Sequence, residues 1–222
     1  MTIVLVPVYK PGPGLRTLLG ELPAGTQVVI VDDGSGPSFD PALDIAGADV
    51  LRHATNQGKG TALKTGFRHI AAAYPGQDVV CADADGQHSV EDILRVAAHA
   101  RESDRMVLGV RRFEENVPLR SKVGNTITQV LFRAATGRRV RDTQTGLRAY
   151  PASLVGDLPA IPGERFEYEM NVLLHAARTG HPIEQVVITT TYLNDNASSH
   201  FGAISDSARI YWPLLRYAFL RG

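Results

Sequence analysis

The sequence predicts an α/β protein with a Rossmann-like, mostly parallel central sheet and helices on both faces. Short β-branched, apolar runs alternate with segments of helical periodicity through the first half of the chain. Several of these runs end in polar residues, at the place where open α/β sheets bind their ligands. The 222 residues contain no internal repeat, low-complexity tract or linker. We therefore expect one domain spanning residues 1–222.

The apolar runs and helical repeats give the expected elements in order. The predicted strands are Ile3–Val8, Val28–Val31, Asp49–Arg52, Val79–Ala82, Met106–Val110 and Ile183–Leu193. The predicted helices are Leu15–Leu22, Gly58–Tyr74, a helix capped by Ser89, Val123–Ala135 and Phe166–Thr179. Residues 204–222 form an amphipathic, aromatic tail, for which we expect a helix. One apolar face fits a membrane interface, the protein's own core or a partner chain equally well.

Composition excludes several classes of protein. The 23 basic and 23 acidic residues cancel, so charge gives no indication of a nucleic-acid partner. A single cysteine, Cys81, excludes an intramolecular disulfide framework and a cysteine-rich zinc site. Residues 1–6 lack the basic start and cleavage site of a signal peptide, and no stretch approaches the roughly 18 apolar residues of a membrane-spanning helix. We expect a cytoplasmic protein.

The chain is organised around the stretch 81–88, which follows a buried strand. Asp83 and Asp85 stand two positions apart, and Gly86 and Gln87 follow them. Carboxylate oxygens at the end of a central strand suit Mg²⁺ or Mn²⁺ held together with substrate phosphates. A surface turn explains the same residue types, and Asp-x-Asp alone does not separate the two interpretations.

Two further polar segments follow neighbouring strands. Asp32 and Asp33 can accept hydrogen bonds from a base or a ribose, or can form a simple turn. Lys59 stands between two glycines at the start of a helix, where backbone N–H groups attract phosphate. The spacing is not that of a P-loop, and Lys59 is equally well explained as a solvated side chain.

Several motifs occur together in a known order. They are Val6-Pro7-Val8-Tyr9, Val31-Asp32-Asp33-Gly34-Ser35, Asn56-x-Gly58-Lys59-Gly60, Asp83-Ala84-Asp85-Gly86-Gln87-His88, Asp142-Thr143-Gln144-Thr145-Gly146-Leu147-Arg148, Phe166-Glu167-Tyr168-Glu169-Met170-Asn171 and Ser199-His200-Phe201. This succession resembles family 2 glycosyltransferases of the GT-A fold, specifically the polyprenyl-phosphate (dolichyl-phosphate) mannosyl- and glucosyltransferase branch. The resemblance covers nearly the whole chain.

The resemblance implies a nucleotide-diphosphate sugar donor, a divalent metal and inversion at the anomeric carbon. It assigns residues 1–110 to the nucleotide sugar and residues 111–203 to the acceptor. The donor residues it implies are Pro7, Tyr9, Asp32, Asp33, Lys59, Asp83, Ala84 and Asp85. Asp83, Asp85 and Gln87 would hold Mg²⁺ or Mn²⁺. Arg111, Arg120 and His200 would bind the acceptor phosphate, with Arg148 and His200 closing over the donor. Many relatives carry Asn-Glu where this chain has Lys10-Pro11, which leaves one nucleoside contact open.

The predicted reaction is transfer of a hexose from a UDP- or GDP-sugar to polyprenyl phosphate. The protein would lie peripherally at the inner face of the membrane, on the membrane surface or beside a small membrane protein. A phosphate acceptor is already ionised, whereas a saccharide or other hydroxyl acceptor needs a general base. Asp142 is the first candidate base, with Glu167 and Glu169 behind it, although Arg141 beside Asp142 favours an orienting role. A nucleotide-sugar-binding subunit without turnover is the non-enzyme alternative.

Overall fold

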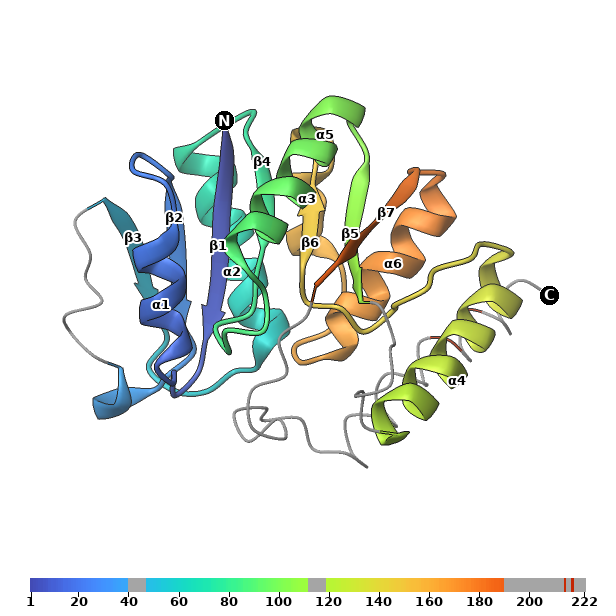
Figure 1. The fold of residues 1–222 in the computed structure, drawn as a ribbon, viewed down its shortest axis with the longest axis horizontal. Helices are drawn as coiled ribbons and strands as arrows, with labels where there is room; N and C mark the ends of the chain where they lie inside the picture. Colours follow the sequence, from blue (N-terminus) through green and yellow to red (C-terminus); the bar gives the residue numbers. More distant parts are fainter. Residues whose placement is uncertain (40–46, 112–118, 190–213, 215–216, 218–222) are drawn as a thin grey trace.

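The structure is a computed structural model that describes residues 1–39, 47–111, 119–189, 214 and 217, without the side chains of residues 119–123 (Figure 1). Its strands are β1 Thr2–Val8, β2 Val28–Asp32, β3 Ala48–Arg52, β4 Asp78–Cys81, β5 Met106–Arg111, β6 Arg148–Tyr150 and β7 Ile183–Ile188. Its α-helices are α1 Gly14–Glu21, α2 Lys59–Ala73, α3 Val90–Ser103, α4 Leu119–Thr136, α5 Ala152–Val155 and α6 Glu167–Thr179. Two 3-10 turns, η1 Gly36–Ser38 and η3 Leu158–Ala160, complete the described elements.

The described strands form one seven-stranded sheet in the order β3-β2-β1-β4-β6-β5-β7. Every neighbouring pair is parallel except the two that involve β6, which runs antiparallel to both β4 and β5. The predicted mostly parallel α/β sheet is confirmed. We did not predict β6, because three residues are too few to show a strand periodicity.

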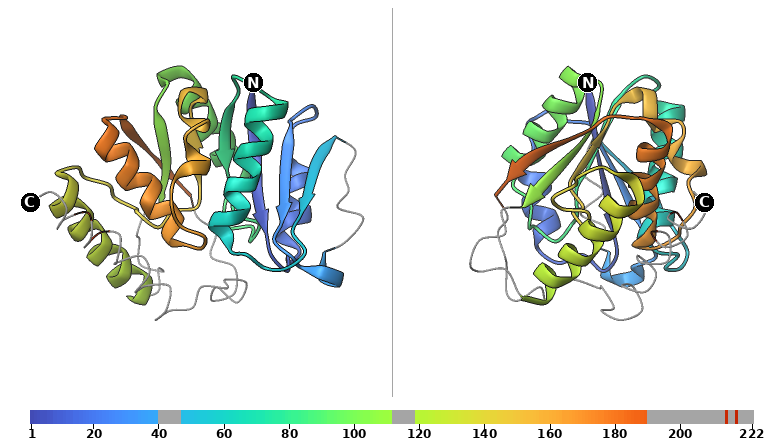
Figure 2. Two further views of the ribbon diagram at one scale, coloured as in Figure 1. Left: turned by 180° about the vertical axis from the view of Figure 1, so that it is seen from behind. Right: turned by 90° about the vertical axis from the view of Figure 1, so that its right-hand side faces the viewer.

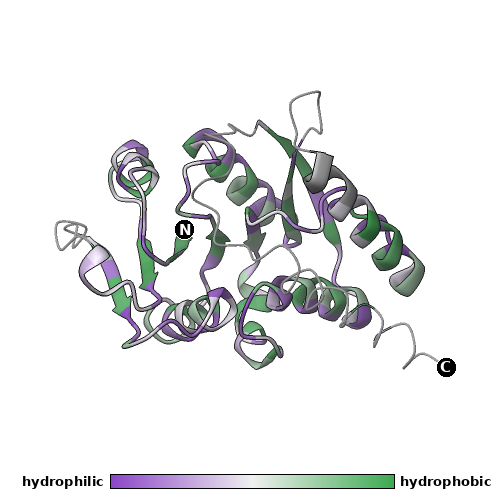
Figure 3. Cartoon of the chain, turned by 90° about the horizontal axis from the view of Figure 1, so that it is seen from below, coloured by the Kyte–Doolittle hydropathy of each residue, from purple (hydrophilic) through white to green (hydrophobic). Residues whose placement is uncertain are grey.

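Apolar side chains fill the space on both faces of the sheet. Helices α1 and α3 cover one face through residues such as Leu15, Ile93 and Val96. Helices α2 and α6 cover the other, where Phe67 packs edge-on against Tyr150 at 5.4 Å between ring centroids. Figure 2 shows the two helix layers from the edge of the sheet, and Figure 3 shows the hydrophobic strands between them.

The structure describes the predicted Ser89 cap and two residues of the predicted amphipathic tail. Ser89 caps α3 as predicted, because its Oγ accepts the backbone N–H of Asp92 at 3.2 Å. In the tail, Leu214 is fully buried in the core and Tyr217 packs against it. These two residues therefore lie on the protein's own core, while the rest of the tail is outside the described residues. Across the described ranges, no helix combines the length and hydropathy needed to cross a membrane.

Candidate functional site

The candidate site lies at the edge of the sheet where the parallel strands end, the lower edge in Figure 1. This edge carries Tyr9 after β1, Asp33 after β2, Asp83 and Asp85 after β4, and Arg111 at the end of β5. The convergence follows from the topology, because parallel strands present their carboxyl ends on one side. Gly14 at the start of α1 also approaches this edge, since a Cβ there would lie 2.9 Å from the backbone of Asp85 and Gly86.

Asp83 is held by Lys59 on α2, which also contacts Glu169 on α6. Its Oδ1 lies 2.7 Å from the Lys59 Nζ, and the same Nζ lies 3.0 Å from the Glu169 Oε2 on α6. Burial opposes the charge of Lys59, yet Asp83 and Glu169 together raise the Lys59 pKa above its usual range. Lys59 is therefore neither a solvated side chain nor open to ligand on all sides. We did not foresee Glu169 as its partner, because an acidic residue in the first turn of a helix is explained by the helix dipole alone.

The two carboxylates of the Asp-x-Asp segment have opposite electrostatic surroundings. Burial would raise the pKa of Asp83, but the Lys59 cation, with smaller contributions from His88 and Arg148, holds it below the usual value. Burial, and then the neighbouring charge of Asp83, raise the pKa of Asp85 to about 6. The backbone N–H of Gln87 donates to the Asp85 Oδ1 at 3.0 Å.

This donor set fits a divalent cation. Two carboxylates that repel each other are stabilised by a positive ion between them, and one or two carboxylates plus substrate phosphates are what Mg²⁺ requires. The described residues hold no group of three or more His, Cys, Asp or Glu side chains placed to bind a metal.

The carboxylates after β2 organise the loops at this edge. The Asp32 Oδ1 accepts the backbone N–H of Ser35 at 3.0 Å. Asp33, which is 2% exposed, accepts the N–H of Gln57 at 2.9 Å and that of Gly58 at 2.7 Å, and its Oδ1 lies 2.8 Å from the His53 Nδ1. Asp33 is thus buried and engaged by the chain itself, so direct contact with a nucleoside remains a prediction only.

The start of α2 differs from the phosphate cradle suggested by its glycines. A Cβ at Gly58 would lie 2.5 Å from the Glu164 carbonyl oxygen, and one at Gly60 would lie 2.6 Å from the Tyr168 Cβ. The backbone N–H of Thr61 donates to the Glu164 carbonyl at 2.9 Å. The glycines therefore allow the start of α6 to pack closely on α2, and that segment covers this end of the helix.

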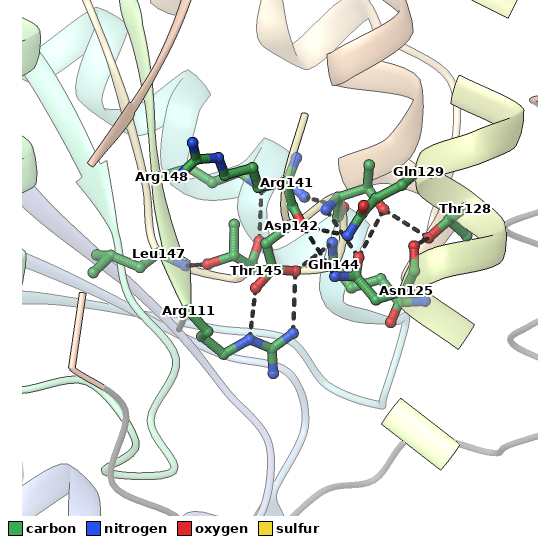
Figure 4. Close-up of polar contacts among 11 residues, drawn as sticks. Arg111, Asn125, Thr128, Gln129, Arg141, Asp142, Gln144, Thr145, Leu147 and Arg148 are labelled. Carbon is green, nitrogen blue, oxygen red and sulfur yellow. Dashed lines mark hydrogen bonds and ion pairs between the residues drawn. The ribbon is translucent and has the colours of Figure 1, made fainter. Parts of the chain in front are cut away.

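At the end of β5, Arg111 forms a bidentate pair with Asp142 (Figure 4). The Arg111 Nε and Nη2 donate to the two Asp142 oxygens at 2.6 and 3.1 Å, and Asp142 is fully buried. The N–H of Gln144 also donates to Asp142, at 3.2 Å. Both Asp142 oxygens are therefore engaged by the chain itself, while the orienting role expected from its basic surroundings remains a prediction.

The loop carrying Asp142 is fixed to α4 through a buried amide. The Asn125 Nδ2 donates to the Arg141 carbonyl at 3.2 Å, and its Oδ1 accepts the N–H of Thr143 at 3.2 Å (Figure 4). Thr128 adds a hydroxyl contact to Thr143 at 2.7 Å. Nothing in the sequence around Asn125 singled it out, because a polar residue within an amphipathic helix is ordinary.

Arg148 is buried and bonded to the backbone of neighbouring segments. It is 1% exposed within β6, and its guanidinium donates to the backbone carbonyls of Thr145, Thr143 and Glu169 at 2.8, 3.1 and 2.6 Å. The guanidinium is thus engaged by the chain itself, and a role for Arg148 over the donor remains a prediction only. His200 and the Arg120 side chain are outside the described residues.

The charges of Asp83 and Arg111 have opposite effects on the pKa of His88. Burial lowers its pKa, while Asp83 opposes this shift and Arg111 adds to it. Its Nδ1 is buried without a hydrogen-bond partner among the described residues. The sequence placed His88 beside the carboxylates but could not show that Arg111 also influences its pKa.

Comparison with known proteins shows which family the chain belongs to. The profile described as glycosyl transferase family 2 matches residues 3–157. The chain belongs to glycosyltransferase family 2. An uncharacterised protein of Methanocaldococcus jannaschii is 32% identical over 97% of this chain and 92% of its own length. The undecaprenyl-phosphate mannosyltransferase of Micrococcus luteus is 30% identical over 84% of this chain and 82% of its own.

The fold of this family 2 glycosyltransferase is also found in solved structures. Glucosyl-3-phosphoglycerate synthase of Mycobacterium tuberculosis, in complex with Mn²⁺, UDP and its product, superposes with a TM-score of 0.74. The match covers 99% of this chain and 80% of the synthase, at 16% identity. It shows that the predicted GT-A fold is correct.

Proposed function

We propose that this family 2 glycosyltransferase is an inverting, metal-dependent enzyme that moves a hexose from a UDP- or GDP-sugar to polyprenyl phosphate. The observation that carries the proposal is that the Asp83 and Asp85 carboxylates, after β4, and Arg111, at the end of β5, lie at the same carboxyl edge of the sheet. In a glycosyltransferase, this arrangement separates a diphosphate-binding region from an anion-binding region.

On the donor side, Asp83 and Asp85 would hold Mg²⁺ or Mn²⁺ with the donor diphosphate, and Gln87 is the proposed third ligand. When bound, the metal would neutralise the charge that develops on the departing phosphate. Lys59 keeps Asp83 ionised and oriented. Pro7, Tyr9, Asp32 and Ala84 line the same edge and are the proposed contacts to the remainder of the donor.

On the acceptor side, Arg111 is the proposed phosphate-binding residue, because its guanidinium has five N–H donors, of which the pair with Asp142 uses two. A phosphate nucleophile is ionised at neutral pH and needs no strong base. Asp142 accepts hydrogen bonds from Arg111 and Gln144, and Glu167 accepts the N–H of Glu164 at 2.9 Å. These contacts disfavour a base role and hence a hydroxyl acceptor. The undecaprenyl-phosphate mannosyltransferase supports a lipid phosphate.

Helix α4 and the loop after it support association with a membrane surface. Residues 119–141 contain six basic residues and no acidic one: Arg120, Lys122, Arg133, Arg138, Arg139 and Arg141. Ile127 is 43% exposed and Val130 is 61% exposed, one turn apart on α4. A helix that combines exposed apolar residues with basic neighbours suits an anionic lipid surface.

Binding to vesicles tests the membrane part of the proposal. Replacing Ile127 and Val130 by serine should reduce sedimentation with phosphatidylglycerol vesicles. The matched control is Leu94→Ser, which changes a residue 37% exposed on α3 and should leave binding unchanged. Equal binding by both variants would contradict the assignment of α4.

The reaction itself is tested by nucleotide release. A panel of UDP- and GDP-sugars is incubated with Mg²⁺ or Mn²⁺, with and without a short polyprenyl phosphate, and Asp85→Ala is the control. Release that requires both metal and lipid phosphate, and is lost in the variant, would support the proposal and identify the donor. Donor binding without lipid-stimulated release would overturn the lipid acceptor in favour of another acceptor or a binding subunit.

A further inference from the structure

Four charged side chains of alternating sign link the core to the candidate site. Arg148 on β6 lies 3.8 Å from the Glu169 Oε1, and the Glu169 Oε2 lies 3.0 Å from the Lys59 Nζ. That Nζ lies 2.7 Å from Asp83. Arg148 and Glu169 are buried, and the side chain of Lys59 is 17% exposed. Charges in such a setting act strongly on one another because water screens them little.

The helices that carry Lys59 and Glu169 are locked together next to these residues. Gly60 packs against Tyr168, and the N–H of Thr61 donates to the Glu164 carbonyl. The Phe166 ring lies under the Lys59 ammonium at 6.0 Å. Lys59 and Glu169 therefore meet at a joint that leaves them little freedom to change their relative position.

Asp83 is confined on its second oxygen as well. The Gly146 backbone comes so close that a Cβ there would lie 2.0 Å from the Asp83 Oδ2. With Oδ1 on Lys59 and Oδ2 against Gly146, the plane of this carboxylate is set by parts of the chain outside its own turn. Asp85, in contrast, accepts a backbone N–H from within its own turn.

We propose that Glu169 is a positioning residue, which acts through Lys59 to fix the orientation of the Asp83 carboxylate. It rests on the proposed function, in which Asp83 contacts the metal-bound diphosphate of the donor. Glu169 holds the ammonium at one place on the core, and the ammonium in turn holds Asp83. Changes to groups that orient a metal ligand cost about 10–100-fold in metal affinity or activity.

The test measures binding of UDP and GDP to the full chain by calorimetry, with and without Mn²⁺. Glu169→Gln keeps the size of the side chain and removes its charge, and we expect it to weaken Mn²⁺-dependent binding about tenfold. Metal-free binding should not change. The control is Glu167→Gln on the same helix, whose carboxylate accepts the N–H groups of Glu164 and Arg165. It should leave the effect of Mn²⁺ intact.

A second variant separates positioning from folding stability. Lys59→Met combined with Glu169→Gln removes both partners of the buried pair, which costs less stability than removing one. We expect this double variant to melt above Lys59→Met alone but to bind no better in Mn²⁺. Recovery of both stability and affinity would overturn the proposal, as would wild-type affinity in Glu169→Gln. If the wild-type chain binds neither nucleotide with Mn²⁺, the proposed function fails first and this proposal fails with it.

Discussion

Gly146→Ala is the substitution whose effect the structure defines most sharply. Gly146 lies in the loop before β6, and the new Cβ would stand 2.0 Å from the Asp83 Oδ2 and 2.6 Å from its Cγ. Real Cβ contacts essentially never fall below 3.0 Å, so one of the two groups has to move by about 1 Å. Because β4 and β6 are paired at Cys81 and Arg148, close to both residues, the carboxylate has to move before the backbone does.

The cost follows from what that movement breaks. Asp83 lies 2.7 Å from Lys59, and a displacement of about 1 Å takes this contact beyond hydrogen-bonding distance. Forcing an extra methyl group into a packed site costs about 1–3 kcal/mol. For a chain of this length each kcal/mol lowers Tm by about 2–4 °C, so we expect a drop of about 2–12 °C. Nucleotide binding in Mn²⁺ should weaken by about tenfold or more, because Asp83 loses its orientation.

The assay combines thermal unfolding with calorimetric titration of UDP and GDP in Mn²⁺. Gly156→Ala serves as the matched control, because a Cβ at this helical position meets nothing within 4 Å. It should leave binding unchanged and should not lower Tm, because alanine adopts this backbone conformation without strain. If Gly146→Ala melts and binds like the wild type, the Asp83 carboxylate is not confined as described, and the argument for its positioning fails.

Three more outcomes are expected. The pKa of the Asp85 carboxyl is raised to about 6, so below that pH a metal must displace a proton to bind. Mn²⁺ affinity measured between pH 5 and 8 should therefore fall about tenfold for each pH unit below 6, and it should be constant well above pH 6. Asp142→Asn removes the buried charged partner of Arg111 and should lower the free energy of unfolding by about 3–5 kcal/mol. The KM for the acceptor should rise by a larger factor than kcat falls. A large loss of kcat with KM unchanged would instead indicate that Asp142 is a general base. Asp33→Asn weakens the charge-assisted bonds from Gln57 and Gly58, each worth about 1.5–3 kcal/mol, and should speed amide exchange at both residues.

The fold was largely readable from the sequence because its signals are local. Runs such as Val28–Asp32 are apolar and β-branched, and Ser89 stands directly before its helix. Strand β6 escaped prediction because its place depends on partners far along the chain, with Cys81 on one side and Leu108 on the other. A short antiparallel insertion of this kind leaves no periodicity to detect.

The sequence predicted where the site residues lie, but not which side chains contact each other. Asp83, Asp85 and Arg111 lie at the predicted edge, because parallel topology alone puts them there. Which charge meets which is decided by packing between distant segments. Lys59 therefore turned out to bridge to Glu169, and Arg148 to support the sheet from inside. Spacing along the chain carries no information on contacts of this kind.

The two carboxylates of one short motif are consequently not equivalent. Asp83 is bound to the core through Lys59 and Glu169, and the Lys59 cation lowers its pKa. Asp85 accepts a hydrogen bond from within its own turn, and its pKa is raised by burial and by repulsion from the neighbouring charge of Asp83. A divalent cation would relieve that cost mainly at Asp85. We therefore interpret Asp83 as the carboxylate whose position is fixed by the core, and Asp85 as the carboxylate whose charge makes cation binding favourable.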